Sequence, residues 1–164
     1  MKFLLIDRIS ELEHGRRIVA HKAVSLAEEY LADHFPTFPV LPGVFVLEAM
    51  VQASAWLVRA ALDFRPGLVL LKEARNVTYK SFVAPGRVLR VESLCRELTD
   101  GSSTFAASGW LEDLEIAKGR LTLRHFDLAE IDPELAGVDT RSRENARALF
   151  SRLLAGRPEQ PALA

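Results

Sequence analysis

The amino-acid sequence predicts an α+β domain in which a curved antiparallel sheet wraps around one long central helix, followed by a short C-terminal helix. Two observations support this fold class. Residues 44–62 are apolar on almost every helical face, so other elements must surround them. After Gly67, helical spacing gives way to period-two alternation in four successive segments. A helix followed by an antiparallel meander is typical of α+β domains.

The chain before this helix contains one predicted strand and a stiff loop. β-Branched residues between positions 17 and 25 indicate a strand, and residues 26–31 suit a helical turn. The loop over residues 33–43 contains three prolines, which fix φ and remove backbone donors. Because Pro42 disfavours helical geometry in the residue before it, we expect the long helix to begin after this position.

The second half of the chain predicts four consecutive strands separated by turns. Pro66-Gly67 ends the helix, Pro85-Gly86 indicates a turn, and Asp100-Gly101 is a hairpin signal. The predicted strands cover residues 68–80 (interrupted near 73–74), 87–97, 104–111 and 117–126.

The chain beyond residue 128 has a different character, so we divide the protein into a domain over residues 1–128 and an extension over residues 129–164. An apolar stripe with helical spacing predicts a short amphipathic helix, with Ser142 as N-cap and Gly156 with Pro158 as the stop. The stripe consists of Ala146, Leu149, Phe150, Leu153 and Leu154. Packing on the outside of the sheet is the simpler interpretation, and docking of a partner is the alternative.

The composition excludes several function classes. A net charge of −1 gives no overall attraction to nucleic acid or to a membrane surface. The single cysteine, Cys95, excludes an internal disulfide framework and a multi-cysteine zinc site, and it suits a cytoplasmic protein. The apolar stretch 44–58 is interrupted by polar residues and is shorter than the roughly 20 residues of a bilayer span, so we interpret it as a core helix. No phosphate-binding loop or dinucleotide fingerprint is present in the sequence.

Three residues around the start of the long helix form a candidate proton-transfer site. His34 leads the proline-rich loop and offers a base, whereas Glu48 lies in the second turn of the apolar helix and offers an acid. Burial favours the protonated, proton-donating form of a carboxyl group. Gly43 lies at the expected helix N-terminus, where N–H groups lack intrahelical partners and a missing side chain lets a carbonyl oxygen approach. The alternatives are a surface histidine, a structural ion pair at Glu48 and a simple tight turn at Gly43.

These residues also belong to a motif. The segment HFPTFPVLPGV (34–44), followed by EAMVQ (48–52), resembles the signature of bacterial 3-hydroxyacyl-[acyl-carrier-protein] dehydratases, which are hotdog-fold enzymes of type II fatty-acid synthesis. With glutamate as the carboxylate at position 48, the motif resembles the broad-range branch of that family. The segments FLLIDR (3–8) and NVTYKSFVAPG (76–86) are similar to further parts of the family, so the resemblance covers roughly residues 3–126.

The resemblance implies a role for each of these residues. His34 would be the catalytic base, Glu48 the acid, and Gly43 the N–H donor to the thioester carbonyl. Gln52 would orient Glu48. The acyl chain would contact Pro42, Phe45 and Val46.

The resemblance also implies partners. The substrate would be attached to an acyl carrier protein, and the basic candidates for docking the carrier are Lys72, Lys80, Arg87 and Arg59. The two catalytic side chains would come from opposite subunits of a homodimer, which would assemble further into a trimer of dimers. The resemblance implies no metal, cofactor, nucleic acid or membrane.

Some features depart from the family pattern. Thr37 stands where the family usually has glycine, and the chain beyond about residue 127 is additional. Two other functions therefore stay open. One is a related hotdog enzyme, either a thioesterase or a dehydratase of a specialised polyketide or polyene pathway. The other is a non-catalytic homologue that binds acyl groups.

Overall fold

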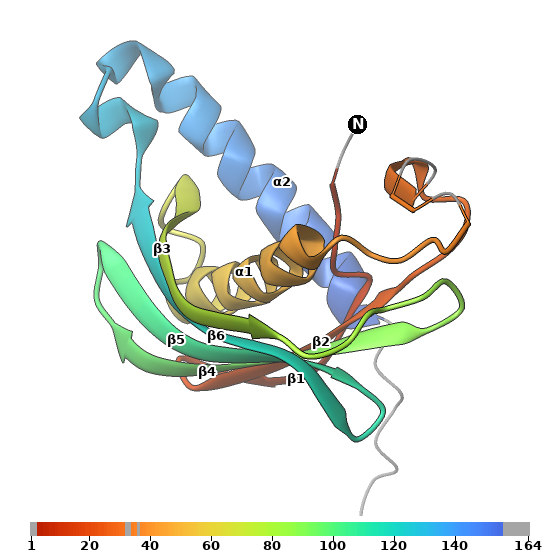
Figure 1. Cartoon of the computed structure of the whole chain (residues 1–164). Helices are drawn as coiled ribbons and strands as arrows, with labels where there is room; N and C mark the ends of the chain where they lie inside the picture. Colours follow the sequence, from red (N-terminus) through yellow and green to blue (C-terminus); the bar gives the residue numbers. More distant parts are fainter. Residues whose placement is uncertain (1–2, 32–33, 36, 156–164) are drawn as a thin grey trace, which may run out of the picture.

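One curved antiparallel sheet holds the long helix on its concave side (Figure 1). The computed structural model describes residues 3–31, 34–35 and 37–155, and within them six strands pair in the order β1-β2-β4-β5-β6-β3. This arrangement confirms the predicted α+β class. The elements are β1 (Arg8–Glu13), β2 (Arg17–Ala23), η1 (Glu29–Leu31), α1 (Gly43–Ala61), β3 (Leu68–Tyr79), β4 (Val88–Leu98), β5 (Ser102–Leu111), β6 (Leu114–Phe126), η2 (Leu128–Glu130), η3 (Pro133–Leu135) and α2 (Ala136–Ala155).

Helix α1 forms the centre of the core, as its composition predicts. Ala49, Met50 and Ala53 are fully buried and face inward-pointing side chains of the sheet such as Phe105 and Leu89. Small residues on α1 let the curved sheet approach it closely. By length and composition alone α1 is long enough to cross a membrane, but half of its most apolar window is buried within this fold, as in the core helix of a globular domain.

The strands β3 to β6 confirm the four predicted strands, whereas β1 was missed. On β5, Ser103, Phe105 and Ala107 are buried and alternate with more exposed neighbours. Strand β1 lies at one edge of the sheet, where Ile9 is its only buried residue. An edge strand with a single buried side chain lacks the alternation that reveals a strand in a sequence.

Strand β3 forms the opposite edge of the sheet and is irregular. It pairs with β6 on one side only, and its register shifts between Leu71 and Glu73 and again between Arg75 and Thr78. The first shift coincides with the interruption predicted near residues 73–74. The free side of β3 offers unpaired backbone groups to another strand.

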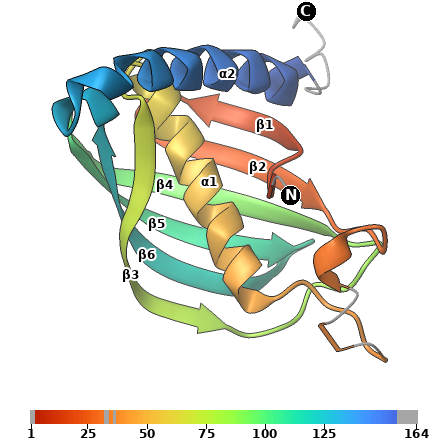
Figure 2. The same ribbon diagram turned by 90° about the horizontal axis from the view of Figure 1, so that it is seen from above.

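Helix α2 differs from its prediction in length and in position. It begins at Ala136, so Ser142 lies inside the helix and is not its N-cap. It crosses the end of α1 and passes over β1 on the concave side of the sheet, not on its outer face (Figure 2). Leu153 is buried in the core, and the Phe150 ring packs against Trp56 and Phe64. Packing of the apolar stripe is therefore confirmed; Gly156 and Pro158 lie outside the described residues.

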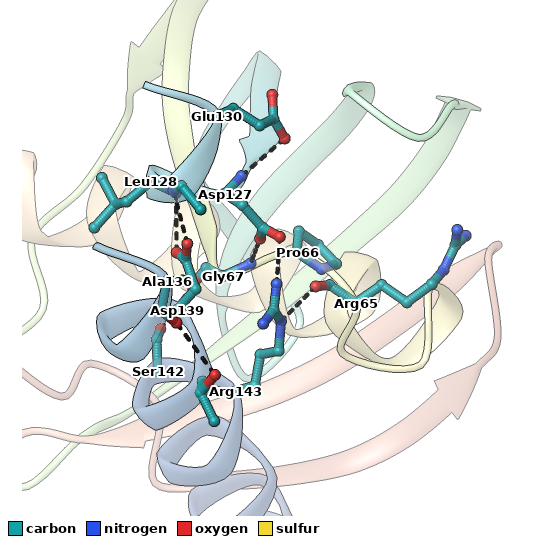
Figure 3. Close-up of polar contacts among 12 residues, drawn as sticks. Arg65, Pro66, Gly67, Asp127, Leu128, Glu130, Ala136, Asp139, Ser142 and Arg143 are labelled. Carbon is teal, nitrogen blue, oxygen red and sulfur yellow. Dashed lines mark hydrogen bonds and ion pairs between the residues drawn. The ribbon is translucent and has the colours of Figure 1, made fainter. Parts of the chain in front are cut away.

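A polar cluster, which we call the clasp, fastens α2 to the loop after α1 (Figure 3). It consists of Arg65, Gly67, Asp127, Asp139, Ser142 and Arg143. The buried Asp139 carboxylate accepts hydrogen bonds of 2.9 Å from the backbone N–H groups of Leu128 and Ala129. Burial acts to raise the pKa of Asp139, but these N–H groups and the Arg143 charge outweigh it and lower the pKa.

Three bonds from α2 complete the clasp. Arg143 donates to the Arg65 carbonyl at 2.7 Å and pairs with Asp127, and the Ser142 hydroxyl donates to the Gly67 carbonyl at 2.6 Å. Two basic side chains of α2 form ion pairs: Arg143 pairs with Asp127, and Arg147 pairs with Asp63 at 3.1 Å.

Candidate active site

Gln52 connects the N-terminal segment to the carboxyl group of Glu48. The Gln52 Oε1 atom accepts a hydrogen bond of 3.0 Å from the Leu5 N–H. Its Nε2 atom donates to the Phe3 carbonyl at 3.0 Å and to Glu48 Oε1 at 2.9 Å. Because the backbone N–H of Leu5 engages the amide oxygen, the amide nitrogen must face Glu48. The carboxyl group is therefore held in one orientation by a residue one helical turn away.

Glu48 is less enclosed than the sequence suggests. Its side chain is half-buried, since it lies on the face of α1 that the sheet does not cover. Within residues 3–31, 34–35 and 37–155, no hydrogen bond involves its second carboxyl oxygen, Oε2. That oxygen is available to carry a proton toward a ligand.

The start of α1 provides backbone donors. The helix begins at Gly43, and Pro42 occupies the N-cap position, where its ring offers no capping hydrogen bond. The Pro42 carbonyl accepts from the N–H groups of Phe45 and Val46 at 2.8 and 3.3 Å. The N–H groups of Gly43 and Val44 precede the first intrahelical bond, at the positive end of the helix dipole. This geometry suits an oxygen that gains negative charge during a reaction.

Tyr79 lies beside this helix start, although no motif in the sequence marks it as a functional residue. A β-carbon added to Gly43 would lie 3.4 Å from Cε1 and 3.5 Å from Cζ of the Tyr79 ring. Tyr79 is the last residue of β3, 36 positions away in sequence, and 47% of its surface is exposed. No local sequence pattern predicts a contact between Gly43 and Tyr79, because they are so far apart in the chain.

His34 is partly exposed, and its ring packs on Phe35 with 4.5 Å between the ring centroids. Phe35 adopts a positive φ of 58°, so the loop turns sharply after the histidine. Among the residues that the structure describes, no hydrogen bond or ion pair joins His34 to Glu48. Within one chain, the structure thus links Glu48 with Gln52 and Gly43 with Tyr79, but it does not link the candidate base with the candidate acid.

The residues expected to contact an acyl chain lie in different environments. Phe45 is half-buried and packs edge-on against Tyr30, with ring centroids 4.8 Å apart, and against Phe3. Val46 is only 3% exposed and points toward Gly109 of the sheet, so it belongs to the core. Pro42 forms the helix cap described above.

The four basic candidates for docking a carrier protein are not equivalent. Lys80 pairs with Glu115, and Arg87 pairs with Glu112. Arg59 donates to the carbonyl groups of Pro66 and Gly67 at the far end of α1, roughly 24 Å along the helix from Gly43. Arg59 is therefore structural. Lys72 is exposed, and among the described residues it has no ion pair.

Apolar side chains are exposed around the helix start. Val44, Phe38 and Phe82 are each more than half exposed, and the Phe38 and Phe82 rings meet edge to face at 6.4 Å. By contrast, a hollow of about 290 Å³ lies at the other end of α1, where Leu62 and His125 are among its lining residues. None of its lining residues belongs to the candidate site.

Comparison with known proteins gives consistent results for this region. The model of a family described as a FabA-like domain matches residues 1–120. The 3-hydroxyacyl-[acyl-carrier-protein] dehydratase FabZ of Symbiobacterium thermophilum is 36% identical over 131 residues, which cover 80% of this chain and 92% of that protein. The enzyme of the same name from Clostridium kluyveri is 30% identical over 119 residues, which cover 73% of this chain and 83% of that protein.

The fold also matches solved structures. A chain of the dehydratase heterocomplex ApeI:P from Xenorhabdus doucetiae superimposes with a TM-score of 0.65 at 20% identity, covering 81% of this chain and 90% of that one. At this identity the match concerns the fold alone. The family model ends before α2, so Arg65 and Gly67 of the clasp lie within the part of the chain that it covers, whereas Asp127, Asp139, Ser142 and Arg143 lie outside it.

Proposed function

Because this chain belongs to the FabA-like domain family, we propose that it dehydrates a 3-hydroxyacyl thioester, attached to an acyl carrier protein, to the trans-2-enoyl thioester. The observation that carries the proposal is the Gln52–Glu48 hydrogen bond, which fixes a carboxyl group near the helix start whose first N–H groups are free of intrahelical bonds. The relatives that cover most of this chain are named as dehydratases of this type. The reaction would serve fatty-acid synthesis in the cytoplasm.

In the proposed mechanism, three groups move or stabilise charge. His34 removes the α-proton of the substrate, and the electron pair left behind delocalises onto the thioester oxygen. The Gly43 N–H stabilises that oxygen. When the electrons return to form the α,β double bond, the bond to the 3-hydroxyl breaks, and Glu48 supplies the proton that releases it as water. Exchange with solvent then removes the proton from His34 and returns a proton to Glu48.

The proposal includes a homodimer. No hydrogen bond or ion pair among the described residues joins His34 to Glu48, and in the proposed dimer a neighbouring copy would supply one of the two groups to each site. The free edge of β3 and the exposed Leu70 and Leu71 on it provide a surface on which a second copy can pair and bury apolar area. Dimers of this kind would assemble further into a trimer of dimers.

The carrier protein would dock through exposed cations and exposed apolar side chains. An acidic carrier is attracted by cations without acidic partners, and of the four candidates Lys72 is the one that the structure leaves exposed and without an ion pair within residues 3–31, 34–35 and 37–155. The exposed apolar side chains of Val44, Phe38 and Phe82 would be covered by the carrier or by its pantetheine arm.

The test is turnover of 3-hydroxyacyl thioesters by the full chain and by two variants. His34→Ala and Glu48→Gln should each lower kcat by at least about 10²-fold if both residues carry out acid–base chemistry. His14→Ala and Glu134→Gln, at exposed positions outside the candidate site, are the matched controls and should leave kcat unchanged. Near-normal turnover in both site variants would refute the assignment. Release of free thiol without loss of water would indicate a thioesterase instead.

A further inference from the structure

The Tyr79 ring lies against the first residue of α1. A β-carbon on Gly43 would be 3.4, 3.5 and 3.6 Å from Cε1, Cζ and Cδ1 of that ring. The Cζ atom carries the phenolic hydroxyl. The hydroxyl oxygen is therefore bonded to an atom that a β-carbon on Gly43 would contact. The missing side chain of Gly43 therefore leaves a space with the backbone N–H at the helix start and an aromatic edge beside it.

The Tyr79 hydroxyl is available to a ligand. Among the described residues, it makes no hydrogen bond, and the side chain is 47% exposed. Partial burial of the ring raises the pKa of Tyr79 above its ordinary value. The hydroxyl therefore keeps its proton throughout the neutral range and acts as a donor.

We propose that the Tyr79 hydroxyl is a second hydrogen-bond donor to the thioester oxygen of the substrate, beside the Gly43 N–H. This inference rests on the proposed dehydratase function. Two donors that converge on one oxygen stabilise the negative charge that develops there when the α-proton leaves, and they need no rearrangement at that moment.

The surrounding structure holds Tyr79 in place. It ends β3 opposite Ala117 of β6, and the next residue, Lys80, donates its N–H to the Ile116 carbonyl at 2.7 Å. This pairing continues the ladder through Tyr79, so its side-chain direction is set by the sheet. A donor fixed on a strand is better positioned for catalysis than one on a loop.

The experiment compares two variants that each remove only a hydroxyl group. Tyr79→Phe keeps the ring and its contact with Gly43, and it should lower kcat about tenfold with little change in KM. Tyr30→Phe is the matched control, because Tyr30 is the other tyrosine of the chain and its buried hydroxyl has no hydrogen-bond partner among the described residues. Tyr30→Phe should leave kcat unchanged. Thermal unfolding of both variants checks that the fold is retained.

The possible results separate this proposal from the one on which it rests. An unchanged kcat in Tyr79→Phe, whatever its KM, would show that the ring serves only for packing and would overturn the proposal. A loss of activity in Tyr79→Phe that is matched in Tyr30→Phe would also overturn it. If the unsubstituted protein turned over no hydroxyacyl thioester, the dehydratase function and the Tyr79 proposal would fail together.

Discussion

The carboxyl group of Asp139 fills the space that a side chain on Gly67 would occupy. A β-carbon at Gly67 would lie 2.8 Å from Asp139 Cγ, a distance that β-carbons in proteins do not show. Gly67 also donates its N–H to Asp127 Oδ1 at 2.6 Å and accepts from the Ser142 hydroxyl through its carbonyl. The loop after α1 and helix α2 are thus fitted to each other around this glycine, which is buried.

Gly67→Ala should destabilise the fold. The methyl group can be accommodated only if Asp139 moves away from the N–H groups of Leu128 and Ala129, and such overpacking costs about 1–3 kcal/mol. Chemical denaturation at neutral pH measures the change. Gly137→Ala is the control: a β-carbon there would lie 3.6 Å from Arg141 Nη1, so this helical position should gain up to about 1 kcal/mol. Equal stability of the two variants would contradict the packing described for Gly67.

Gln52→Leu should impair both stability and turnover. The change leaves the Leu5 N–H and the Phe3 carbonyl without their partner, at a cost of about 1–3 kcal/mol, and frees Glu48 to rotate. We expect kcat to fall about tenfold. Gln52→Glu keeps an acceptor for the Leu5 N–H but cannot donate to Glu48 or to the Phe3 carbonyl. It should lower kcat at least as much as Gln52→Leu; near-normal kcat in both variants would argue against a positioning role.

Gly43→Ala should lower activity without loss of stability. The added β-carbon would make ordinary van der Waals contact with the Tyr79 ring, and alanine is favoured over glycine in a helix by up to about 1 kcal/mol. The methyl group would nevertheless occupy the space through which an oxygen reaches the N–H groups at the helix start. Steady-state kinetics should show kcat/KM reduced at least about tenfold. A variant with unchanged kcat/KM would mean that no substrate oxygen approaches here.

Mild acid should destabilise the protein through His125. Burial lowers the pKa of this histidine, although the Asp100 carbonyl opposes the shift. That carbonyl accepts from Nδ1–H at 3.2 Å, so Nε2 is left to accept from the Ser103 hydroxyl at 2.8 Å, and the ring is neutral. The pKa of His125 is therefore lower in the folded state than in the unfolded state. The stability that neutral His125 contributes is present above about pH 6.5 and is lost as the pH falls below that value.

Denaturation curves at a series of pH values measure this effect. His125→Gln should flatten the decline of the unfolding free energy between neutral and mildly acid pH, and His14→Gln, at an exposed turn position, should not. His21, whose pKa burial and the nearby Arg8 and Arg90 also lower, will leave a residual slope. A slope that is the same with and without His125 would contradict the assignment.

The sequence predicted the parts of the fold whose signals are local and strong. Helix α1 was placed within one residue at each end, because a nearly all-apolar helix between proline signals has few alternatives. Strand β1 was missed because an edge strand needs few buried side chains. The start of α2 was misplaced because Ser142, a good N-cap by composition, instead bonds to Gly67, and only the folded chain reveals that partner.

In the candidate site, too, local features could be predicted from the sequence and tertiary contacts could not. The motif identified His34, Gly43 and Glu48. The hydrogen bond between Gln52 and Glu48 follows from the spacing of these two residues, which is one helical turn. The contact between Gly43 and Tyr79 depends on how β3 meets α1, which no short pattern encodes. The half-exposure of Glu48 likewise follows from which face of α1 the sheet leaves open.

The clasp bears on how shortened forms of this protein should be prepared. A fragment cut at residue 120, where the match to the family model stops, would lack Asp127, Ser142 and Arg143 and would uncover the rings of Trp56 and Phe64. Such a fragment would present an apolar surface to solvent and self-associate during expression. Truncations that keep the chain through Ala155 preserve the partners of the loop after α1.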